Sequence, residues 1–305
     1  MICLLGVDLG TSGTKTVLFD AEGREVASQS VEYPLYQPQN GWAEQDPRDW
    51  WNAAVGTIRG VLDKSGVAPG DVKGLGISGQ MHGLVLTDAQ GNPLGRSLIW
   101  CDGRTQRECE EITQAVGEKR LIEIAANPAL TGFTAGKILW VRRHRPELFA
   151  RARHALLPKD YVRYRLTGDF VTDDIEAMGF MLLDANRNAW SEHLCALAGI
   201  PIAAMPEIVR PTQGLSPIRQ EALAETGLAE GTPVIAGATD TAMEVYAAGA
   251  NRPGEATVKL ATAGRICSIT PRAVVDPCLV TYRHVVDGLW YPGTATKSCA
   301  ASNRW

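Results

Sequence analysis

Short apolar runs flank a glycine-rich block near each end of this 305-residue chain. At the N-terminal end, residues 2–7 and 16–19 flank the block Gly6-Val7-Asp8-Leu9-Gly10-Thr11-Ser12-Gly13-Thr14-Lys15. Near the C-terminal end, residues 256–260 and 266–270 flank the shorter block Leu260-Ala261-Thr262-Ala263-Gly264-Arg265, which repeats leucine, small residue, threonine, small residue and glycine. Apolar runs of this length around glycine-rich turns predict two β-hairpins.

Helical and extended patterns alternate between the two hairpins. Asp46 followed by Pro47 is typical of a helix start and predicts a helix over residues 50–62. Further strands are predicted over 73–77, 83–86, 97–100 and 234–236, and further helices over 104–115, 136–143, 159–166 and 243–248. This interleaving of strands and helices predicts an α/β fold.

The turn-rich residues 249–254 predict a boundary between two units. Residues 1–250 would form a first lobe, and residues 251–305 would begin a second lobe of similar kind. A segment as short as 251–305 rarely builds a core of its own. The chain also ends without a helix stop signal, so we expect a two-lobed protein whose second lobe is incomplete here.

Composition and charge exclude several classes of function. The net charge is −4, and the absence of a lysine- and arginine-rich run argues against nucleic-acid binding. No apolar stretch is long enough to span a membrane, and the short apolar start lacks the basic lead of a signal peptide. Seven scattered cysteines without a Cys-x-x-Cys pair indicate reduced thiols and a cytoplasmic protein, and a structural zinc site is not expected.

The glycine-rich hairpins suit phosphate groups, because their turns present backbone N–H groups and hydroxyls. A Walker loop and a dinucleotide-binding loop both fit badly, since each requires a different glycine spacing and a helix directly after the loop. Two such hairpins that face each other could hold the phosphate chain of a nucleotide, with Asp8 placed for a metal ion. The plainer alternative for each block is a tight turn without a ligand.

Several further motifs, in the same order along the chain, carry a resemblance to a known family. They are Gly41 to Pro47, Gly79-Gln80-Met81-His82-Gly83, Trp100 to Arg104, Leu157-Pro158-Lys159-Asp160-Tyr161 and Gly237 to Ala242. Together with the first glycine block, they resemble the FGGY family of carbohydrate kinases, and within it the xylulokinases most closely. The resemblance covers essentially the whole chain. It implies an actin-like, ribonuclease H-like ATPase fold.

The same resemblance implies transfer of a phosphoryl group from MgATP to a primary hydroxyl of a ketopentose, with D-xylulose converted to D-xylulose 5-phosphate. Such chemistry needs positioning, charge neutralisation and a base that accepts the hydroxyl proton. Asp240 is the expected base, and a simple helix cap is its alternative role. The sugar is expected to contact Gln80, Met81, His82 and Asp240. The phosphates are expected to lie against Gly10, Thr11, Ser12, Gly13, Thr14, Lys15, Thr262 and Gly264, with Mg²⁺ at Asp8.

Three departures from the family pattern leave the substrate open. Thr241 stands where xylulokinases commonly carry asparagine, Ala261 stands where the second block usually has glycine, and residues 173–179 also differ. D-ribulose, another pentulose or a pentitol therefore stays an alternative substrate. The chain alone is expected to be weakly active or inactive, and a homodimer is left open. A non-catalytic sugar-binding fragment or pseudo-kinase, and another actin-like ATPase, are the competing functions.

Overall fold

The computed structural model describes residues 2–260 and 264–296, and a five-stranded mixed sheet lies at its centre. The strands follow the order β13 (Ala238–Thr239), β5 (Val72–Gly79), β1 (Cys3–Leu9), β2 (Gly13–Asp20) and β3 (Glu25–Glu32). β1, β2 and β3 form an antiparallel meander, whereas β5 runs parallel to both β1 and β13. The predicted first hairpin is therefore confirmed as β1 and β2.

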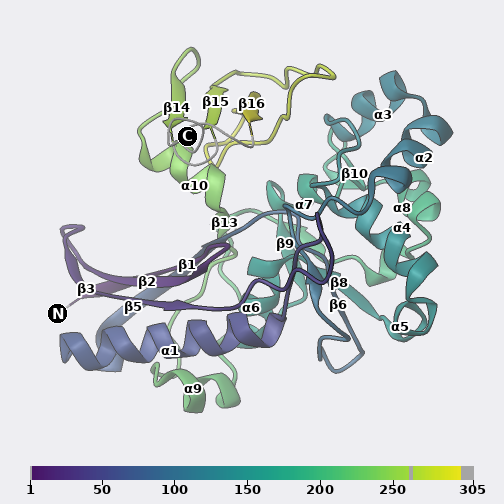
Figure 1. Ribbon diagram of the computed structural model, residues 1–305. Helices are drawn as coiled ribbons and strands as arrows, with labels where there is room; N and C mark the ends of the chain where they lie inside the picture. The colour runs from purple at the N-terminus through teal and green to yellow at the C-terminus, as the bar shows by residue number, and fades with distance from the viewer. Residues whose placement is uncertain (1, 261–263, 297–305) are drawn as a thin grey trace.

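Helix α1 (Pro47–Ser65) covers one face of this sheet together with α6 (Pro158–Thr167), and α9 (Gln220–Thr226) packs against both helices (Figure 1). Asp46 caps α1 by accepting a hydrogen bond from the Arg48 N–H, and Pro47 occupies the first turn, as the sequence predicts. Alternate residues of β1 and β2 are buried on the α1 face, where the Thr16 hydroxyl donates to that of Thr57 at 2.7 Å. The opposite face of the sheet is more exposed.

A second, mostly helical unit follows the sheet. Its hydrophobic core is separate from the core between α1 and the sheet. It contains α2 (Gln106–Val116), α3 (Glu118–Ala125), α4 (Thr134–His144), α5 (Pro146–Arg151), α7 (Glu176–Gly179) and α8 (Glu192–Ala198). The short strands are β4 (Glu44–Gln45), β6 (Val85–Thr87), β7 (Ser97–Leu98), β8 (His154–Leu156), β9 (Val171–Asp173), β10 (Leu183–Asp184), β11 (Ala189–Trp190) and β12 (Glu207–Val209), with single 3-10 turns at Pro69–Asp71 and Ile202–Ala204. Within the described residues, no helix is both long and apolar enough to cross a membrane.

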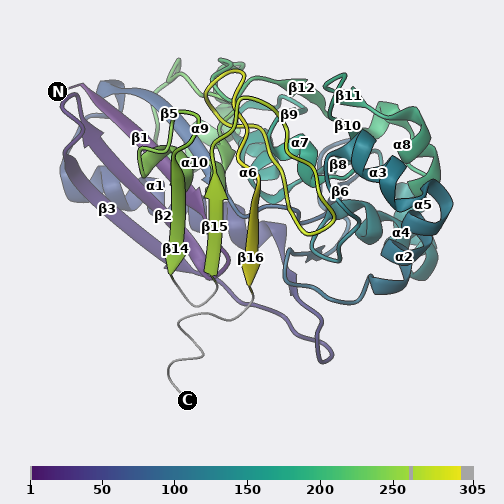
Figure 2. The ribbon, with the colours of Figure 1, turned by 90° about the horizontal axis from the view of Figure 1, so that it is seen from above.

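The second predicted hairpin is confirmed as β14 (Ala256–Leu260) and β15 (Gly264–Ser268), which pair antiparallel and are joined by β16 (Gly293–Thr296). Figure 2 shows these three strands side by side, and Figure 1 shows them apart from the first sheet. Residues 276–291 run from this small sheet back to the helical unit. There Tyr282 and Tyr291 are buried in the same core as α3 and α4, so contacts cross the predicted boundary at residue 250.

The predicted strand over 234–236 is displaced along the chain. Val234 forms only an isolated bridge with Leu75, and the strand itself is β13 at Ala238–Thr239. Gly237 separates the two pairings with a φ of +76°, and a Cβ built there would lie 1.9 Å from the Ile77 carbonyl oxygen. Only glycine fits this backbone, which turns the chain into β13. The following helix, α10 (Asp240–Ala247), begins three residues earlier than predicted.

Candidate active site

The carboxyl ends of three neighbouring parallel strands gather the polar residues of the candidate site. In the register of the sheet, Leu9 of β1 lies beside Gly79 of β5, which lies beside Thr239 of β13. The first glycine turn, the Gln80–His82 loop and Asp240 leave the sheet from these three positions. Ligands commonly bind at the carboxyl ends of the strands in open α/β sheets. The structure therefore places sequence motifs up to 230 residues apart at one edge of the sheet, since Gly10 and Asp240 follow β1 and β13, the two neighbours of β5.

Asp240 is the first residue of α10 but is not its cap. The Thr239 hydroxyl accepts the hydrogen bond from the Ala242 N–H at 3.1 Å, so Thr239 caps the helix. Asp240 is half-buried, and its Oδ1 accepts a hydrogen bond from the Thr241 N–H at 2.6 Å. Burial raises the pKa of Asp240 to about 6, and the nearby carboxylates of Glu244 and Asp8 act in the same direction. A carboxyl group with this pKa is largely ionised at neutral pH and can accept a proton.

Asp8 and Lys15 lie directly opposite each other on β1 and β2, and both are exposed on the face turned away from α1. The Ser78 hydroxyl donates to Asp8 Oδ1 at 2.7 Å, which fixes the carboxylate and leaves its second oxygen for other partners. Among the described residues, no group of three or more histidine, cysteine, aspartate or glutamate side chains could hold a metal ion. One exposed carboxylate still suits Mg²⁺, which keeps several of its water ligands in proteins. Lys15 points to the same face as Asp8, as a phosphate contact requires.

Hydrogen bonds to its backbone carbonyl groups hold the first glycine turn in place. The Gly10 carbonyl accepts from the Tyr33 hydroxyl and from Gln80 Nε2, and the Thr11 carbonyl accepts from Gln45 Nε2 at 2.7 Å. Trp100 Nε1 donates to the Thr11 hydroxyl at 2.8 Å. These contacts fix the turn and leave Ser12 exposed at its tip. The supporting roles of Tyr33 and Gln45 had no signal in the sequence beyond the position of Gln45 in a motif.

Three of the predicted ligand contacts have buried side chains. Thr14 faces the α1 side of the sheet and is 1% exposed, so only its backbone lies near the turn. Gln80 is equally buried, and its amide donates to Gln45 Oε1 at 2.8 Å as well as to Gly10. Met81 packs in the core of the helical unit. In this arrangement Gln80 supports the glycine turn, and His82 is the partly exposed residue of its motif.

His82 has a left-handed backbone with a φ of +67°, which is uncommon for a residue other than glycine. Its carbonyl oxygen accepts hydrogen bonds from the Thr134 hydroxyl and from Lys137 Nζ, each at 3.0 Å. Lys137 is fully buried, and burial lowers its pKa to about 7. These two donors come from α4 and hold the loop in its strained conformation.

Both nitrogens of the His82 ring form hydrogen bonds. Nδ1 lies 3.3 Å from the Gly179 carbonyl oxygen, which can only accept, so Nδ1 carries the proton. Nε2 then accepts the hydrogen bond from the Tyr282 hydroxyl at 3.1 Å. Burial, with the positive charge of Lys137, lowers the pKa of His82 to about 3 and keeps the ring neutral.

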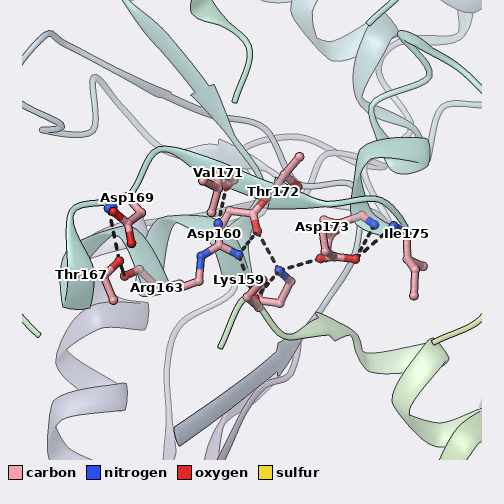
Figure 3. Close-up of polar contacts among 11 residues, drawn as sticks. Lys159, Asp160, Arg163, Thr167, Asp169, Val171, Thr172, Asp173 and Ile175 are labelled. Atoms are coloured by element: carbon pink, nitrogen blue, oxygen red, sulfur yellow. Dashed lines mark hydrogen bonds and ion pairs between the residues drawn. The ribbon is translucent and has the colours of Figure 1, made fainter. Parts of the chain in front are cut away.

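A buried network of charges positions the segment that leads to Asp240 (Figure 3). Lys159 Nζ lies 2.7 Å from Asp160 Oδ1 and 2.9 Å from Asp173 Oδ2, and Arg163 Nη1 lies 2.9 Å from Asp160 Oδ1. Both cations also donate to the Ala236 carbonyl, Lys159 at 3.4 Å and Arg163 at 2.9 Å. Because Ala236 precedes Gly237 and β13, the network fixes the approach to Asp240. The Leu157–Tyr161 motif thus has a structural role that sequence reasoning left unassigned.

The second glycine hairpin lies partly outside the described residues. Thr262, a predicted phosphate contact, lies outside the described residues, whereas Gly264 opens β15 opposite Leu260. The side chain of Arg265, the next residue, reaches far enough to act on the pKa of both Asp240 and His82. The sequence offered no separate signal for Arg265.

A surface hollow of about 420 Å³ lies elsewhere, against α2, α3 and α8, with Arg120, Asp184, Arg187 and His193 among its lining residues. It is separate from the strand ends described above. The residues at the strand ends support a different chemistry from the residues that line this hollow. A carboxylate of raised pKa, a fixed glycine turn and a second carboxylate suit acceptance of a hydroxyl proton beside a bound phosphate chain.

Comparison with known proteins gives consistent matches. A family model, the FGGY family of carbohydrate kinases, N-terminal domain, matches residues 3–246. The chain is 38% identical to a xylulose kinase of Bacillus subtilis over 87% of its own length and 53% of that protein. It is 34% identical to a xylulose kinase of Escherichia coli over 99% of its own length and 62% of that protein. The chain thus spans between half and two thirds of the length of these relatives.

A solved structure gives the same picture. The crystal structure of a xylulose kinase from Rhodospirillum rubrum matches with a TM-score of 0.95 and 30% sequence identity, over 99% of this chain and 62% of that one. The matches confirm both the family resemblance and the predicted actin-like ATPase fold.

Proposed function

The chain belongs to the FGGY family of carbohydrate kinases, and we propose that it forms the sugar-binding and catalytic part of a kinase that phosphorylates a primary hydroxyl of D-xylulose. ATP is the proposed phosphoryl donor, and D-xylulose 5-phosphate is the proposed product. D-ribulose, another pentulose and a pentitol are the alternative acceptors. Because the chain spans only part of its relatives, both the activity and the substrate are proposals for the protein as a whole.

The single observation that carries the proposal is the position of Asp240 at the same sheet edge as the first glycine turn. Both follow the carboxyl ends of strands in one sheet, at matched positions of the register. Thr239 already caps α10, so the Asp240 carboxylate is not needed for that purpose. Its raised pKa, of about 6, suits a base that works near neutral pH.

In this proposal, each residue has a defined task. Asp240 holds the reacting hydroxyl and accepts its proton as the oxygen attacks the terminal phosphorus. The turn at Gly10–Gly13 binds phosphate oxygens through backbone N–H groups, and Lys15 adds positive charge on the same face. Mg²⁺, when bound with ATP, would neutralise charge on the phosphates, and Asp8 is the carboxylate that would hold it or its water shell.

His82 is the proposed sugar contact from the loop after β5, and the side chains of its neighbours Gln80 and Met81 are buried. Both ring nitrogens of His82 already have partners, so a sugar hydroxyl that reaches Nε2 would take the place of the Tyr282 hydroxyl. A neutral ring with an accepting Nε2 suits a sugar hydroxyl, which can donate to it.

Residues 251–305 are proposed to begin the nucleotide-binding lobe, with ATP between the two glycine hairpins. Several large apolar side chains of β14 and β15 are exposed, with exposures of 62% for Val258, 76% for Leu260 and 54% for Ile266. An apolar face of this kind commonly lies against another protein surface. A further part of the nucleotide-binding lobe would cover it.

The first experiment is thermal melting of the 305-residue chain with D-xylulose, D-ribulose and xylitol. A ligand at about 100 times its dissociation constant stabilises the folded state by about 2.7 kcal/mol. We expect D-xylulose to give the largest upward shift and His82→Ala to reduce it. A cooperative melt that no sugar shifts would contradict sugar recognition by this part of the protein.

Phosphorylation is tested separately, with the chain extended by the part of its E. coli relative that it does not span. We expect ATP-dependent formation of a sugar phosphate, and loss of that activity in Asp240→Asn. D-xylulose should still bind to this variant, because the asparagine amide can hydrogen-bond the sugar hydroxyl but cannot accept its proton. Sugar binding without phosphorylation in an extended chain that binds ATP would favour the pseudo-kinase. Phosphate release that does not depend on sugar, and that His82→Ala leaves unchanged, would favour another actin-like ATPase.

A further inference from the structure

Two acidic residues on α10 face two basic residues on the small sheet. Asp240 and Glu244 lie one helical turn apart, and Lys259 of β14 is the cross-strand partner of Arg265 of β15. Residues directly opposite in an antiparallel pair project from the same face of the sheet. Lys259 Nζ forms an ion pair with Glu244 Oε1 at 2.5 Å. The neighbouring pair, Arg265 and Asp240, has the same polarity but forms no ion pair within the described residues.

Arg265 has unused hydrogen-bonding capacity. Its Nε donates to Cys267 Sγ at 3.0 Å, whereas its Nη2 is buried and has no hydrogen-bond partner among residues 2–260 and 264–296. The guanidinium carbon lies 5.5 Å from the ring centre of Tyr291 and 5.9 Å from that of Tyr282. Aromatic rings attract a cation but do not replace a hydrogen-bonding anion. A guanidinium nitrogen without a partner is costly to bury, so an anion beside it would be strongly favoured.

The guanidinium of Arg265, with its unused hydrogen-bonding capacity, lies in the proposed site. Tyr282, over whose ring the guanidinium lies, donates to His82, the proposed sugar contact. The positive charge of Arg265 also lowers the pKa of Asp240 against the larger effect of burial, so the two side chains lie within electrostatic range. Arg265 therefore lies near both the proposed base and the proposed sugar contact.

We propose that Arg265 is a further catalytic residue, which binds the oxygens of the phosphoryl group as it passes from ATP to the sugar beside Asp240. This inference rests on the proposed function. In that step, the bond from the terminal phosphorus to the bridging oxygen of ATP breaks, and the bond from phosphorus to the sugar oxygen forms. The hydroxyl proton goes to Asp240, and ADP leaves with the bridging oxygen. Arg265 forms no covalent bond and stabilises negative charge on the transferred group.

Arginine suits this task better than the other cations nearby. Its planar fork can donate two parallel hydrogen bonds to an oxyanion, and it stays charged at any relevant pH. Lys259 is already paired with Glu244, and Lys15 lies on a different sheet. A carboxylate on an acidic sugar is the other oxyanion that could meet Arg265, and the experiment separates these two sources.

The test measures binding to the 305-residue chain by calorimetry, so that it needs no ATP turnover. The probes are inorganic phosphate, D-xylulose 5-phosphate, D-xylulose and D-gluconate as an acidic sugar. The variant is Arg265→Gln, and the matched control is Lys259→Gln, which removes the cross-strand neighbour of like charge. Arg265→Lys keeps the charge without the fork, and it carries the test if the glutamine variant does not fold.

The expected result is a loss of affinity for phosphate and D-xylulose 5-phosphate of roughly 10- to 100-fold in Arg265→Gln, the usual effect of losing a hydrogen bond to a charged group. D-xylulose binding should be unchanged, and Lys259→Gln should bind all probes as the unmodified chain does. Arg265→Lys should fall between the two.

Three outcomes would overturn the inference. Phosphate binding could survive in Arg265→Gln, the unmodified chain could bind neither phosphate probe, or only D-gluconate binding could depend on Arg265. The last result would assign Arg265 to a substrate carboxylate. In each case D-xylulose binding to the unmodified chain reports separately on the proposed function, so the two failures can be told apart.

Discussion

The hydroxyl of Tyr282 lies 3.1 Å from Nε2 of His82, although 200 residues separate them in the chain. His82 belongs to the loop after β5, whereas Tyr282 belongs to the segment that returns from the small sheet. The contact therefore joins the proposed sugar-binding loop to the part of the chain beyond residue 250. A proposed substrate contact on one side of the predicted boundary depends on a residue from the other side.

Tyr282→Phe removes the hydroxyl that donates to His82 and should lower the free energy of unfolding by about 1 kcal/mol, the usual net value of one hydrogen bond. It also frees Nε2, so D-xylulose should bind at least as tightly as before. Urea unfolding and calorimetry measure the two effects. The control is Tyr246→Phe, which changes a tyrosine that is 45% exposed and should leave both values unchanged. Weaker sugar binding in Tyr282→Phe would show that the phenol itself contacts the sugar.

Gly237→Ala should be severely destabilising, because the added methyl group would overlap the Ile77 carbonyl oxygen and the φ is +76°. We expect a loss of more than about 3 kcal/mol in urea unfolding. Gly231→Ala is the matched control, since Gly231 has a φ of +79° with nothing within 4 Å of the added carbon. That variant should lose only about 1 kcal/mol, for the left-handed backbone alone. Equal losses in the two variants would contradict the tight packing of Gly237 against β5.

The pH dependence of stability should report the raised pKa of Asp240. Its pKa is about 6 in the folded chain against 3.8 for an ordinary aspartate, so the folded state binds the proton more tightly than the unfolded state. Its contribution to stability is therefore present below pH 3.8 and is lost as the pH rises through about 6. Asp240→Asn should then be more stable than the unmodified chain at pH 7.5, with the difference vanishing near pH 4. A difference that does not change between these pH values would exclude a raised pKa.

The same group should control catalysis in the opposite direction. A base must be ionised to accept a proton, so kcat/KM of the extended chain should fall as the pH drops below about 6. The pH profile of D-xylulose binding should be flat over the same range if Asp240 acts mainly on the proton. A rate that stays constant between pH 5 and pH 7 would count against Asp240 as the base.

Lys159→Met should leave Asp160 and Asp173 buried without their shared cation. Removing one partner of a buried ion pair typically costs about 3–5 kcal/mol. The double variant Lys159→Met with Asp173→Leu should recover part of this loss, because it also removes the carboxylate that has lost its cation, whereas Asp160 keeps its ion pair with Arg163. Arg24→Met, which disrupts an exposed ion pair with Asp20, is the control and should have little effect. A small effect in Lys159→Met would mean that the network does not hold the Ala236 segment.

The sequence predicted best those features that depend on local chemistry. Asp46 and Pro47 marked the start of α1, and the two glycine blocks marked both hairpins. The motif that contains Asp240 led to the correct position at a strand end and a helix start. The family resemblance and the fold are confirmed, whereas the roles of the site residues stay predictions.

Features that depend on distant contacts could not be predicted from the sequence. The strand near residue 234 was displaced because Gly237 must pass close to Ile77, which only the register of β5 reveals. Thr14 looked like a phosphate contact, but the alternation of β2 turns its side chain toward α1. Gln80 has a similar explanation, because its amide reaches back to Gln45 and to the glycine turn. No pattern in the amino-acid sequence predicts the hydrogen bond between Tyr282 and His82.

The return of residues 276–291 to the helical unit also has a consequence for biosynthesis. The Asn127 side chain exchanges two hydrogen bonds with the Thr281 backbone, at 2.8 Å and 2.9 Å, and the same unit buries Tyr282 and Tyr291. A chain emerging from the ribosome can form α1 and the strands β1, β2, β3 and β5 early, since domains generally fold from the N-terminal end during synthesis. The helical core, however, lacks its last aromatic residues until residue 291 has emerged. The proposed sugar-binding loop therefore reaches its final form late in translation, and until then the nascent chain exposes an unfinished apolar surface that chaperones can bind.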